Sequence, residues 1–322
     1  MQNKNWLVYV QLGLGMAIFG SGTPVSKIVT DNFPVFLGSM LRMALGTAIL
    51  APFIWQSRTT LRKLERRDWL TLFGIALIGM LVFSVAMLYG MQMVSGVVGS
   101  IVMSTTPAIT AVASLLFLNE KFGWRRGVAV ALAVAGVLVV QLGSGGEGNG
   151  SNVLLGSLLI FVAVCAEASY TLLGKVASDD LQPTTVTGVA AGLAIILFLP
   201  LAAWQLRGFD ASGVSWQGWA AVVWWGLGTL ALGSTLWYQG VKQVEGSTAA
   251  GFMGIMPVSA LVLSYVLLGE AFQWIHLAGF GLVFAGVVLI SRAHMQEMAD
   301  GETSDGQGDR EARTTRQQSA GD

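Results

Sequence analysis

Charged residues and cysteine are scarce in this chain, and both shortages exclude classes of protein. Only 11% of the 322 residues are charged and 54% are hydrophobic, whereas about a quarter of an average soluble domain is charged. A soluble protein of this composition would lack a polar surface, so lipid is the expected solvent. The one cysteine, Cys165, excludes a disulfide framework within the chain, and with two histidines it makes a metal cluster implausible.

The sequence also lacks the signatures of nucleotide and nucleic-acid binding. The net charge is zero and no basic block is present, which argues against nucleic acid. A phosphate-binding loop of the Gly-x-x-x-x-Gly-Lys-Ser/Thr type is missing, and a loose glycine pattern at 226–231 has no strand–helix unit around it. We therefore expect no cofactor. The first residues show no cleavage site, which predicts a retained first helix.

What the chain has instead is a series of long stretches without Asp, Glu, Lys or Arg. A helix needs about 20 apolar residues to cross a bilayer, and these stretches lack the strict alternation of transmembrane strands. They cover 5–26, 69–119, 127–146, 148–166, 181–206, 211–241, 246–269 and 271–291. The sequence therefore predicts an all-α integral membrane protein with ten transmembrane helices, over 6–28, 33–55, 69–89, 95–118, 124–142, 153–175, 184–205, 216–238, 247–268 and 272–291.

Positive charge is distributed unevenly between the predicted loops. Residues 58–67 hold five Lys and Arg residues and residues 121–126 hold three, whereas residues 90–95 hold none. Because basic residues collect on the cytoplasmic side, and because the number of helices is even, both termini are expected inside the cell. This topology places 15 of the 18 basic residues in the cytoplasm.

The chain contains an internal repeat. A shift of 150 residues aligns 96–141 with 246–291 without gaps, and thirteen of the 46 positions are identical. The matches include Pro107 with Pro257, which chance pairing of apolar residues does not readily produce. The first predicted helices align at a shift of 148 residues, which pairs Lys27 with Lys175 in the same way.

Five helices per half is an odd number, so the second half is expected to be inserted upside down. Inverted repeats are typical of secondary transporters, where two like halves exchange conformations around one site. The predicted organisation is a first five-helix repeat over 6–142, a flexible Gly-rich outer loop over 143–152, a second five-helix repeat over 153–292 and a disordered cytoplasmic tail over 293–322.

These residues resemble the drug/metabolite transporter superfamily, specifically its EamA-type members with two five-helix repeats. The resemblance covers residues 6–292 and rests on Phe19-Gly20-Ser21 leading to Lys27, on Arg42, on the pairs Pro107/Glu120 and Pro257/Glu270, and on the Ala-Gly-Val ends of helices five and ten. It implies an exporter of small metabolites, often amino acids, amines or drugs, in the cell inner (plasma) membrane. It also implies a central cavity lined by helices one, three, four, six, eight and nine.

One departure from the family pattern affects the expected cavity. Many members begin helix one with Trp-Gly, whereas this chain has Phe19-Gly20 there and Glu167-Ala168 in the second repeat. No charge in the second half stands opposite Arg42. The cavity is therefore expected to be chemically asymmetric.

Arg42 and Glu167 are the two formal charges well inside predicted spans. An ionised group in hydrocarbon costs several kcal/mol, so such residues usually face a cavity or a partner. We hypothesise that Glu167 binds a substrate ammonium or takes up a proton. The alternative is a buried ion pair with Arg42 that only orients the helices.

Prolines and lysines at matching places in the two halves are candidates for helix breaks and gates. Pro107 and Pro257 remove a backbone hydrogen bond inside a helix, and paired breaks point to a transport site. Lys27 and Lys175 either reach the headgroups or gate the two cavity mouths. Helix-end capping is the expected role of Glu270 and of its counterpart at position 120.

The remaining candidates for the cavity wall are aromatic and polar residues near mid-depth, namely Tyr89, Met103, Ser104, Tyr170, Trp237, Tyr238 and Met253. A mostly apolar wall suits a small amphipathic solute, and the leading hypothesis is alternating-access export of amino acids or similar solutes. The alternatives are a multidrug or quaternary-amine exporter and, from another class, a membrane-embedded enzyme or structural subunit. The expected partners are the substrate and the lipid bilayer. Proton coupling, and the choice between a monomer and a homodimer, are left open.

Overall fold

The computed structural model describes residues 5–118, 124–143, 150–177, 181–244 and 246–292. Within those ranges every regular element is helical, which confirms the predicted all-α class. In chain order the elements are α1 (Asn5–Asn32), α2 (Val35–Gln56), α3 (Arg58–Leu61), α4 (Arg66–Gly74), η1 (Ile75–Val82), α5 (Phe83–Met93), α6 (Gly96–Met103), α7 (Thr106–Leu118), α8 (Trp124–Gly143), α9 (Gly150–Val176), α10 (Pro183–Leu206), η2 (Ala211–Gly213), α11 (Trp216–Val223), η3 (Trp224–Gly233), α12 (Ser234–Val241), α13 (Gly246–Phe252), α14 (Ile255–Leu268) and the helix Trp274–Arg292.

Eight of the described helices are long and apolar enough to cross a bilayer, and two shorter apolar helices accompany them. The shorter ones, Gly127–Val140 and Ile255–Leu268, lie in the fifth and ninth predicted spans. A helix satisfies its own backbone groups, which is what a chain inside hydrocarbon requires. The chain is thus a multi-pass membrane protein, and the count of ten spans stays a prediction.

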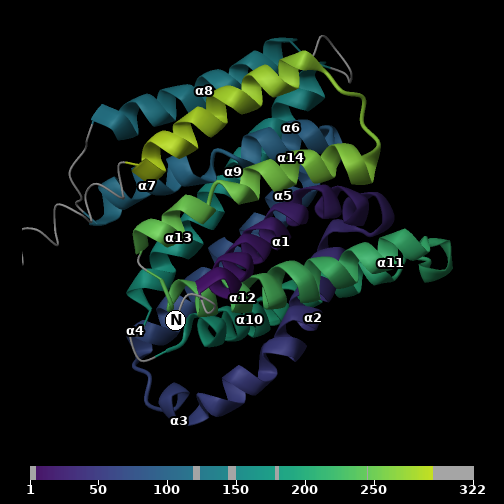
Figure 1. The fold of residues 1–322 in the computed structure, drawn as a ribbon. Helices are drawn as coiled ribbons and strands as arrows, with labels where there is room; N and C mark the ends of the chain where they lie inside the picture. The colour runs from purple at the N-terminus through teal and green to yellow at the C-terminus, as the bar shows by residue number, and fades with distance from the viewer. Residues whose placement is uncertain (1–4, 119–123, 144–149, 178–180, 245, 293–322) are drawn as a thin grey trace, which may run out of the picture.

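Helix α1 lies in the middle of the bundle. Figure 1 shows it running diagonally between α5, α6 and α14 on one side and α11 and α12 on the other, and it packs against all of them. Elsewhere α2 packs mainly on α10, and α5 mainly on α9. Helices from the two sequence halves therefore interdigitate, and a site between them draws on both.

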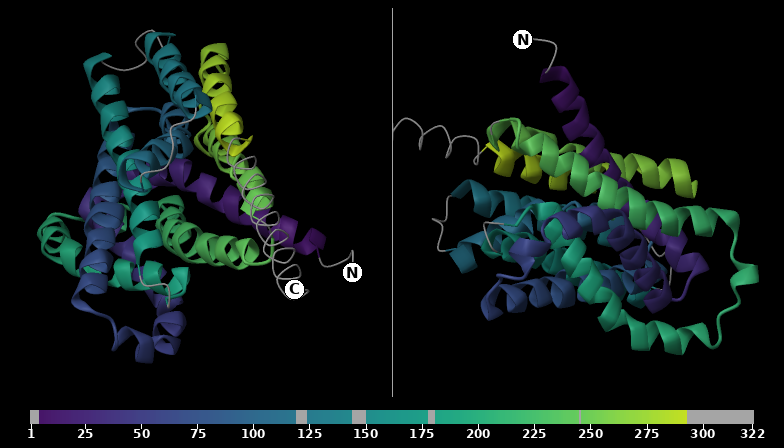
Figure 2. Two further views of the ribbon diagram at one scale, coloured as in Figure 1. Left: turned by 90° about the vertical axis from the view of Figure 1, so that its left-hand side faces the viewer. Right: turned by 90° about the horizontal axis from the view of Figure 1, so that it is seen from below.

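Helix α8 and the helix Trp274–Arg292 pack side by side at the edge of the bundle (Figures 1 and 2). A Cβ atom at Gly136 would lie 2.5 Å from the carbonyl oxygen of Gly279, and one at Gly286 would lie 2.7 Å from that of Ala129. The residue numbers rise along one helix as they fall along the other, so the two helices are antiparallel. Glycine is needed at these points because backbone meets backbone.

The predicted spans 95–118 and 247–268 are each interrupted by a turn. The turn Ser104–Thr105 separates α6 from α7, and the turn Met253–Gly254 separates α13 from α14. Pro107 and Pro257 lie in the first turn of α7 and α14, where a missing N–H is tolerated. Proline therefore lies at the start of a new helix at both places, and each predicted helix break is present as a turn just before the proline rather than as a kink at it.

Two π-helical segments, η1 and η3, also occupy equivalent places in the two halves under the 150-residue shift. Each is continuous with the α-helices before and after it. The wider π turn changes the direction of the side chains that follow, and such segments are frequent at functional sites. Both segments border the site described below.

Several predicted features lie outside the described residues. They are the tail over 293–322, residue Glu120, the side chain of Lys175 and most of the outer loop, residues 144–149. Helix α8 extends to Gly143 and α9 begins at Gly150, so both helices overlap the ends of the predicted loop.

Candidate functional site

Arg42 is buried in the first half of α2 and is held by uncharged partners. Its Cζ atom lies 4.3 Å from the ring centroid of Trp225 and 5.4 Å from that of Phe83. Its Nη1 donates a hydrogen bond of 3.3 Å to Ser84 Oγ, while Nε has no hydrogen-bond partner among the described residues. Aromatic faces attract the guanidinium charge, so Arg42 stays in place with donor capacity left over.

The backbone around η3 explains why Trp225 reaches Arg42. A Cβ atom at Gly226 would lie 2.8 Å from Leu45 Cβ and 3.0 Å from the Arg42 carbonyl oxygen. Only glycine allows η3 to approach α2 this closely. The close approach places the ring of Trp225, which is 2% exposed, directly against the guanidinium.

Glu167 projects from α9 toward the start of α7. Its Oε2 accepts a hydrogen bond of 2.9 Å from the hydroxyl of Thr106. The Glu167 side chain is half-buried. Part of the Glu167 side chain therefore stays accessible from outside the protein.

Arg42 and Glu167 do not form the ion pair that the sequence left open. Among the described residues one ion pair is recorded, between Lys27 and Asp31. The charges of Arg42 and Glu167 still interact electrostatically across the interior. Two opposite charges therefore face the same region, each held by neutral groups and neither neutralised by the other.

Tyrosine hydroxyls extend this polar region toward the second half. Tyr170, one turn after Glu167 on α9, shares a hydrogen bond of 2.7 Å with Thr187 of α10. Its hydroxyl is also within hydrogen-bonding reach of Tyr238 on α12. A Cβ atom at Gly79 of η1 would lie 2.7 Å from Tyr170 Cβ, so that glycine makes room for the tyrosine. Three helices thus contribute to one polar cluster.

The other predicted wall residues have different surroundings. Tyr89 packs edge-on against Phe36, with the ring centroids 6.2 Å apart. Met103 belongs to a buried apolar cluster, and Ser104 is buried with its hydroxyl bonded to the Ser100 carbonyl. Trp237 is half-buried on α12, beside Tyr238.

Met253, by contrast, is 43% exposed at the second helix break. The structure thus links Arg42, Glu167, Tyr170 and Tyr238 through electrostatic and hydrogen-bond contacts, and among the described contacts none joins the side chain of Met103, Ser104 or Met253 to them.

The predicted gate and capping residues make helix-end contacts. Lys27 Nζ donates to the Met91 carbonyl at 2.8 Å, near the end of α5, although α1 continues beyond Lys27 to Asn32. The Glu270 carboxylate accepts from the backbone N–H of Gly96, and from that of Val97 at 2.9 Å, at the first turn of α6. The predicted capping role of Glu270 is confirmed.

Sequence reasoning missed the neutral partners of the two charges. Thr106, Ser84, Phe83 and Trp225 come from helices distant in sequence from the charge they hold. A local pattern does not reveal such partners. The one available signal was Thr106 itself, a hydroxyl directly before Pro107.

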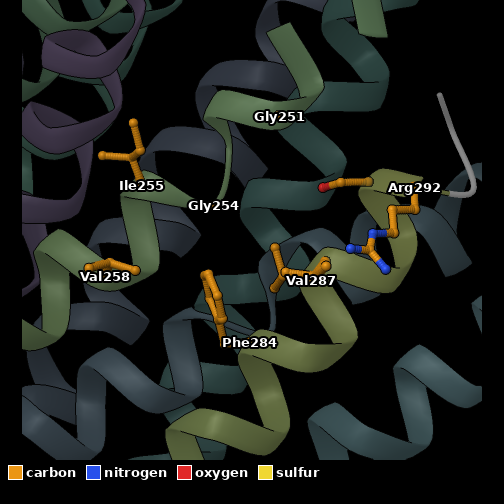
Figure 3. A pocket seen from close by; sticks show the side chains of 9 residues that line it. Gly251, Gly254, Ile255, Val258, Phe284, Val287 and Arg292 are labelled. Atoms are coloured by element: carbon orange, nitrogen blue, oxygen red, sulfur yellow. The ribbon is translucent and has the colours of Figure 1, made fainter. Parts of the chain in front are cut away.

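A separate groove of about 360 Å³ lies between the second helix break and the helix Trp274–Arg292. Figure 3 shows Ile255, Val258, Phe284 and Val287 on its walls and Arg292 at one end. It shares no lining residue with the cluster around Arg42 and Glu167. Its apolar wall suits contact with lipid in a membrane protein.

Ionisable residues inside an apolar helical bundle commonly mark the pathway of a solute or an ion. The model of the EamA-like transporter family matches residues 6–142 and again residues 154–292. The chain belongs to the EamA-like transporter family.

Relatives of this EamA-family chain agree with the assignment. It is 32% identical over 285 residues to YetK, an uncharacterised transporter of Bacillus subtilis (strain 168), covering 88% of this chain and 86% of YetK. It is 23% identical over 292 residues to a probable terminal-alkyne amino-acid exporter of Streptantibioticus cattleyicolor, covering 91% of this chain and 96% of the relative. A crystal structure of a protein 18% identical in sequence superposes with a TM-score of 0.58 over 87% of this chain and 96% of its own, which supports the fold.

Proposed function

We propose that this EamA-family transporter is a secondary exporter of amino acids or similar zwitterionic solutes, working by alternating access through a central cavity that Glu167 lines. The observation that carries the proposal is the relationship between Arg42 and Glu167. An α-amino acid carries a carboxylate and an ammonium group. Arg42 has an unpartnered Nε–H to offer the carboxylate, and Glu167 has free lone pairs to offer the ammonium.

The energetics favour a substrate with both charges. Holding two separate ions in a low-dielectric interior is costly, and their neutral partners offset only part of that cost. A zwitterion placed between them gives each charge an opposite charge. Binding of a zwitterion therefore relieves the electrostatic cost that the two desolvated charges impose on the empty site.

The topology that alternating access requires is supported by several matched features. The contact of Gly136 with Gly279 corresponds to the contact of Gly286 with Ala129 under the 150-residue shift, as in a two-fold arrangement. The helix breaks and π-helical segments also recur at matching places, and the family model matches twice. These features support ten spans in two inverted five-helix repeats. In this topology both termini lie in the cytoplasm, and the protein resides in the inner (plasma) membrane.

A second candidate function is export of amines or cationic drugs. It is favoured by the absence of an ion-pair partner for Glu167 among the described residues and by the nearby rings of Tyr170 and Tyr238. The positive charge of Arg42 in the same region argues against a purely cationic solute. The probable amino-acid exporter among the relatives also favours the first candidate.

Counterflow of labelled neutral amino acids into liposomes that hold the purified protein tests the proposal. We expect saturable uptake in the parent, loss of uptake in Glu167→Gln and in Arg42→Met, and no loss in the control Asp210→Asn, whose carboxylate lies in an exposed turn. The solute should be recovered chemically unchanged, which separates transport from enzymatic turnover.

Competing solutes then distinguish the two candidates. Inhibition by amino acids, and by neither the matching amines nor the matching carboxylic acids alone, supports recognition of both charges. If amines inhibit uptake as strongly as amino acids do, and if the Arg42→Met variant transports amines normally, the zwitterion proposal is wrong. The amine exporter then replaces it.

A further inference from the structure

The first helix break leaves one backbone carbonyl without its usual donor. In a continuous helix the N–H of residue 107 would bond to the Met103 carbonyl, but Pro107 has no N–H. The hydrogen bond recorded to this carbonyl comes instead from the Thr106 hydroxyl, at 2.7 Å. Hydroxyl side chains commonly replace a missing backbone donor in this way.

The same hydroxyl also faces Glu167. Thr106 Oγ1 lies 2.9 Å from Glu167 Oε2, so one hydroxyl has two acceptors within hydrogen-bonding distance. A threonine hydroxyl carries a single proton and donates one strong hydrogen bond at a time. Which acceptor receives it depends on whether Glu167 carries a proton.

We propose that Thr106 is a positioning residue that couples the protonation of Glu167 to the helix break at Ser104–Thr105. When Glu167 is ionised, it only accepts, and Thr106 donates to the carboxylate at the expense of the Met103 carbonyl. When Glu167 takes a proton from water, its O–H donates to Thr106 Oγ1, and Thr106 donates to Met103. Protonation of Glu167 thus gives the Met103 carbonyl at the break a hydrogen-bond donor. Loss of the proton leaves that carbonyl without the donor, so that water must hydrate it.

No other described group competes for this role. The charged and titratable groups that face Glu167 are Arg42 from α2, Tyr170 from α9 itself and, beyond Tyr170, Tyr238 from α12. Arg42 interacts with Glu167 without an ion pair, and the recorded donor to the carboxylate is Thr106. The direct path from the carboxylate to the backbone therefore passes through Thr106.

The second half provides an internal comparison. At its break the Met253 carbonyl accepts the backbone N–H of Met256 at 3.3 Å. Met256 occupies the place of Thr106 and Phe19 that of Glu167 under the repeat shifts. The second break therefore has neither the hydroxyl nor the acid, and protonation acts on one break only.

The coupling between Glu167 and the helix break rests on the proposed function only for its place in a transport cycle. It can be measured without any substrate, so a failure of the coupling is distinguishable from a failure of the proposed function. The background is the full chain with Cys165→Ala, which removes the single thiol. One thiol is then placed at the first break by Ser104→Cys and, as the matched control, at the second by Gly254→Cys. Thiol modification rates are measured against pH in lipid nanodiscs, and infrared spectroscopy follows the carboxyl band that Glu167→Gln removes.

We expect modification at position 104 to become about fivefold faster as Glu167 loses its proton, because one hydrogen bond at the break is lost. The rate at position 254, which reports the thiol's own pH dependence, should show no such step. Thr106→Ser should keep the step. Thr106→Val should give fast modification at every pH while the carboxyl band still titrates.

Glu167→Gln tests the proposal independently of the Thr106 variants, because its amide N–H₂ donates to Thr106 as the protonated acid does. We expect slow modification at position 104 at every pH. The proposal is overturned if the step at position 104 does not follow the carboxyl band, if Thr106→Val keeps the step, or if Glu167→Gln gives the fast rate.

Discussion

The ring of Trp225 lies 4.3 Å from Cζ of Arg42, and the two residues come from opposite halves of the sequence. The stack forms because Gly226 allows η3 to approach the backbone of α2. Arg42 is 9% exposed and its charge has no ion-pair partner among the described residues. The electron-rich face of the Trp225 ring therefore stabilises the Arg42 guanidinium, and it replaces part of the stabilisation that water gives to an exposed arginine.

Removing both members of this stack should cost less than the sum of the single changes. In a double-mutant cycle of Arg42→Met and Trp225→Leu, we expect a coupling of about 1–2 kcal/mol, the value of a desolvated cation–π contact. The measurement is unfolding by SDS in mixed micelles. Additive single effects would contradict the prediction and show that Trp225 acts only by filling space.

The helices, unlike the stack, were visible in the sequence. Hydrocarbon requires about 20 apolar residues in a row, so stretches without charge mark helices whatever their neighbours are. The predicted span 184–205, for example, is α10 over Pro183–Leu206. The predicted span 33–55 is α2 over Val35–Gln56.

The site was predictable only in part. Arg42 and Glu167 were found because a charge in an apolar stretch is exceptional. Their partners were not, because Ser84, Thr106 and Trp225 are ordinary residues in a membrane helix until the fold brings them within reach. The exact form of the predicted breaks at the two prolines was not predictable for a related reason. Whether a helix bends or ends depends on the donors that neighbouring side chains supply.

Glu270 should stabilise the contact between the loop after α14 and the start of α6. Its carboxylate accepts two backbone N–H groups of α6, at the positive end of the helix. We expect Glu270→Ala to lower the free energy of unfolding by about 1–2 kcal/mol. Glu270→Gln keeps one acceptor oxygen and should have an intermediate effect. Equal stability of all three proteins in detergent would contradict the predicted cap.

Two glycines of the helix Trp274–Arg292 should respond differently to the same substitution. A Cβ atom at Gly286 would lie 2.7 Å from the carbonyl oxygen of Ala129, whereas one at Gly281 would meet nothing within 4 Å. Backbone atoms do not move aside easily, so Gly286→Ala should destabilise by about 1–3 kcal/mol. Gly281→Ala should be neutral or stabilising by up to about 1 kcal/mol, because alanine favours the helix.

The measurement is the thermal midpoint of each variant in the same detergent. A lower midpoint for Gly281→Ala than for Gly286→Ala would show that α8 and the helix Trp274–Arg292 do not approach each other as described.

Lys27 and Asp31 form an ion pair at 3.5 Å, yet the two residues should contribute very differently to stability. Lys27 Nζ also donates to the Met91 carbonyl at 2.8 Å, in the last turn of α5, where a positive charge is favourable. We expect Lys27→Met to lower the free energy of unfolding by about 1–2 kcal/mol, because the α5 carbonyl loses a charged donor. Asp31→Asn should change it by no more than about 0.5 kcal/mol, because the Asp31 side chain is 54% exposed and an exposed ion pair contributes little.

Unfolding by SDS, repeated at low and at high salt, checks both values. A strong salt dependence of the Lys27→Met effect would mean that the exposed pair with Asp31, rather than the bond to Met91, provides the stabilisation. An effect that persists at high salt fits the bond between α1 and α5. In that case Lys27 fixes the central helix α1 to α5 during transport, and a gating role for this lysine would require that bond to break in each cycle.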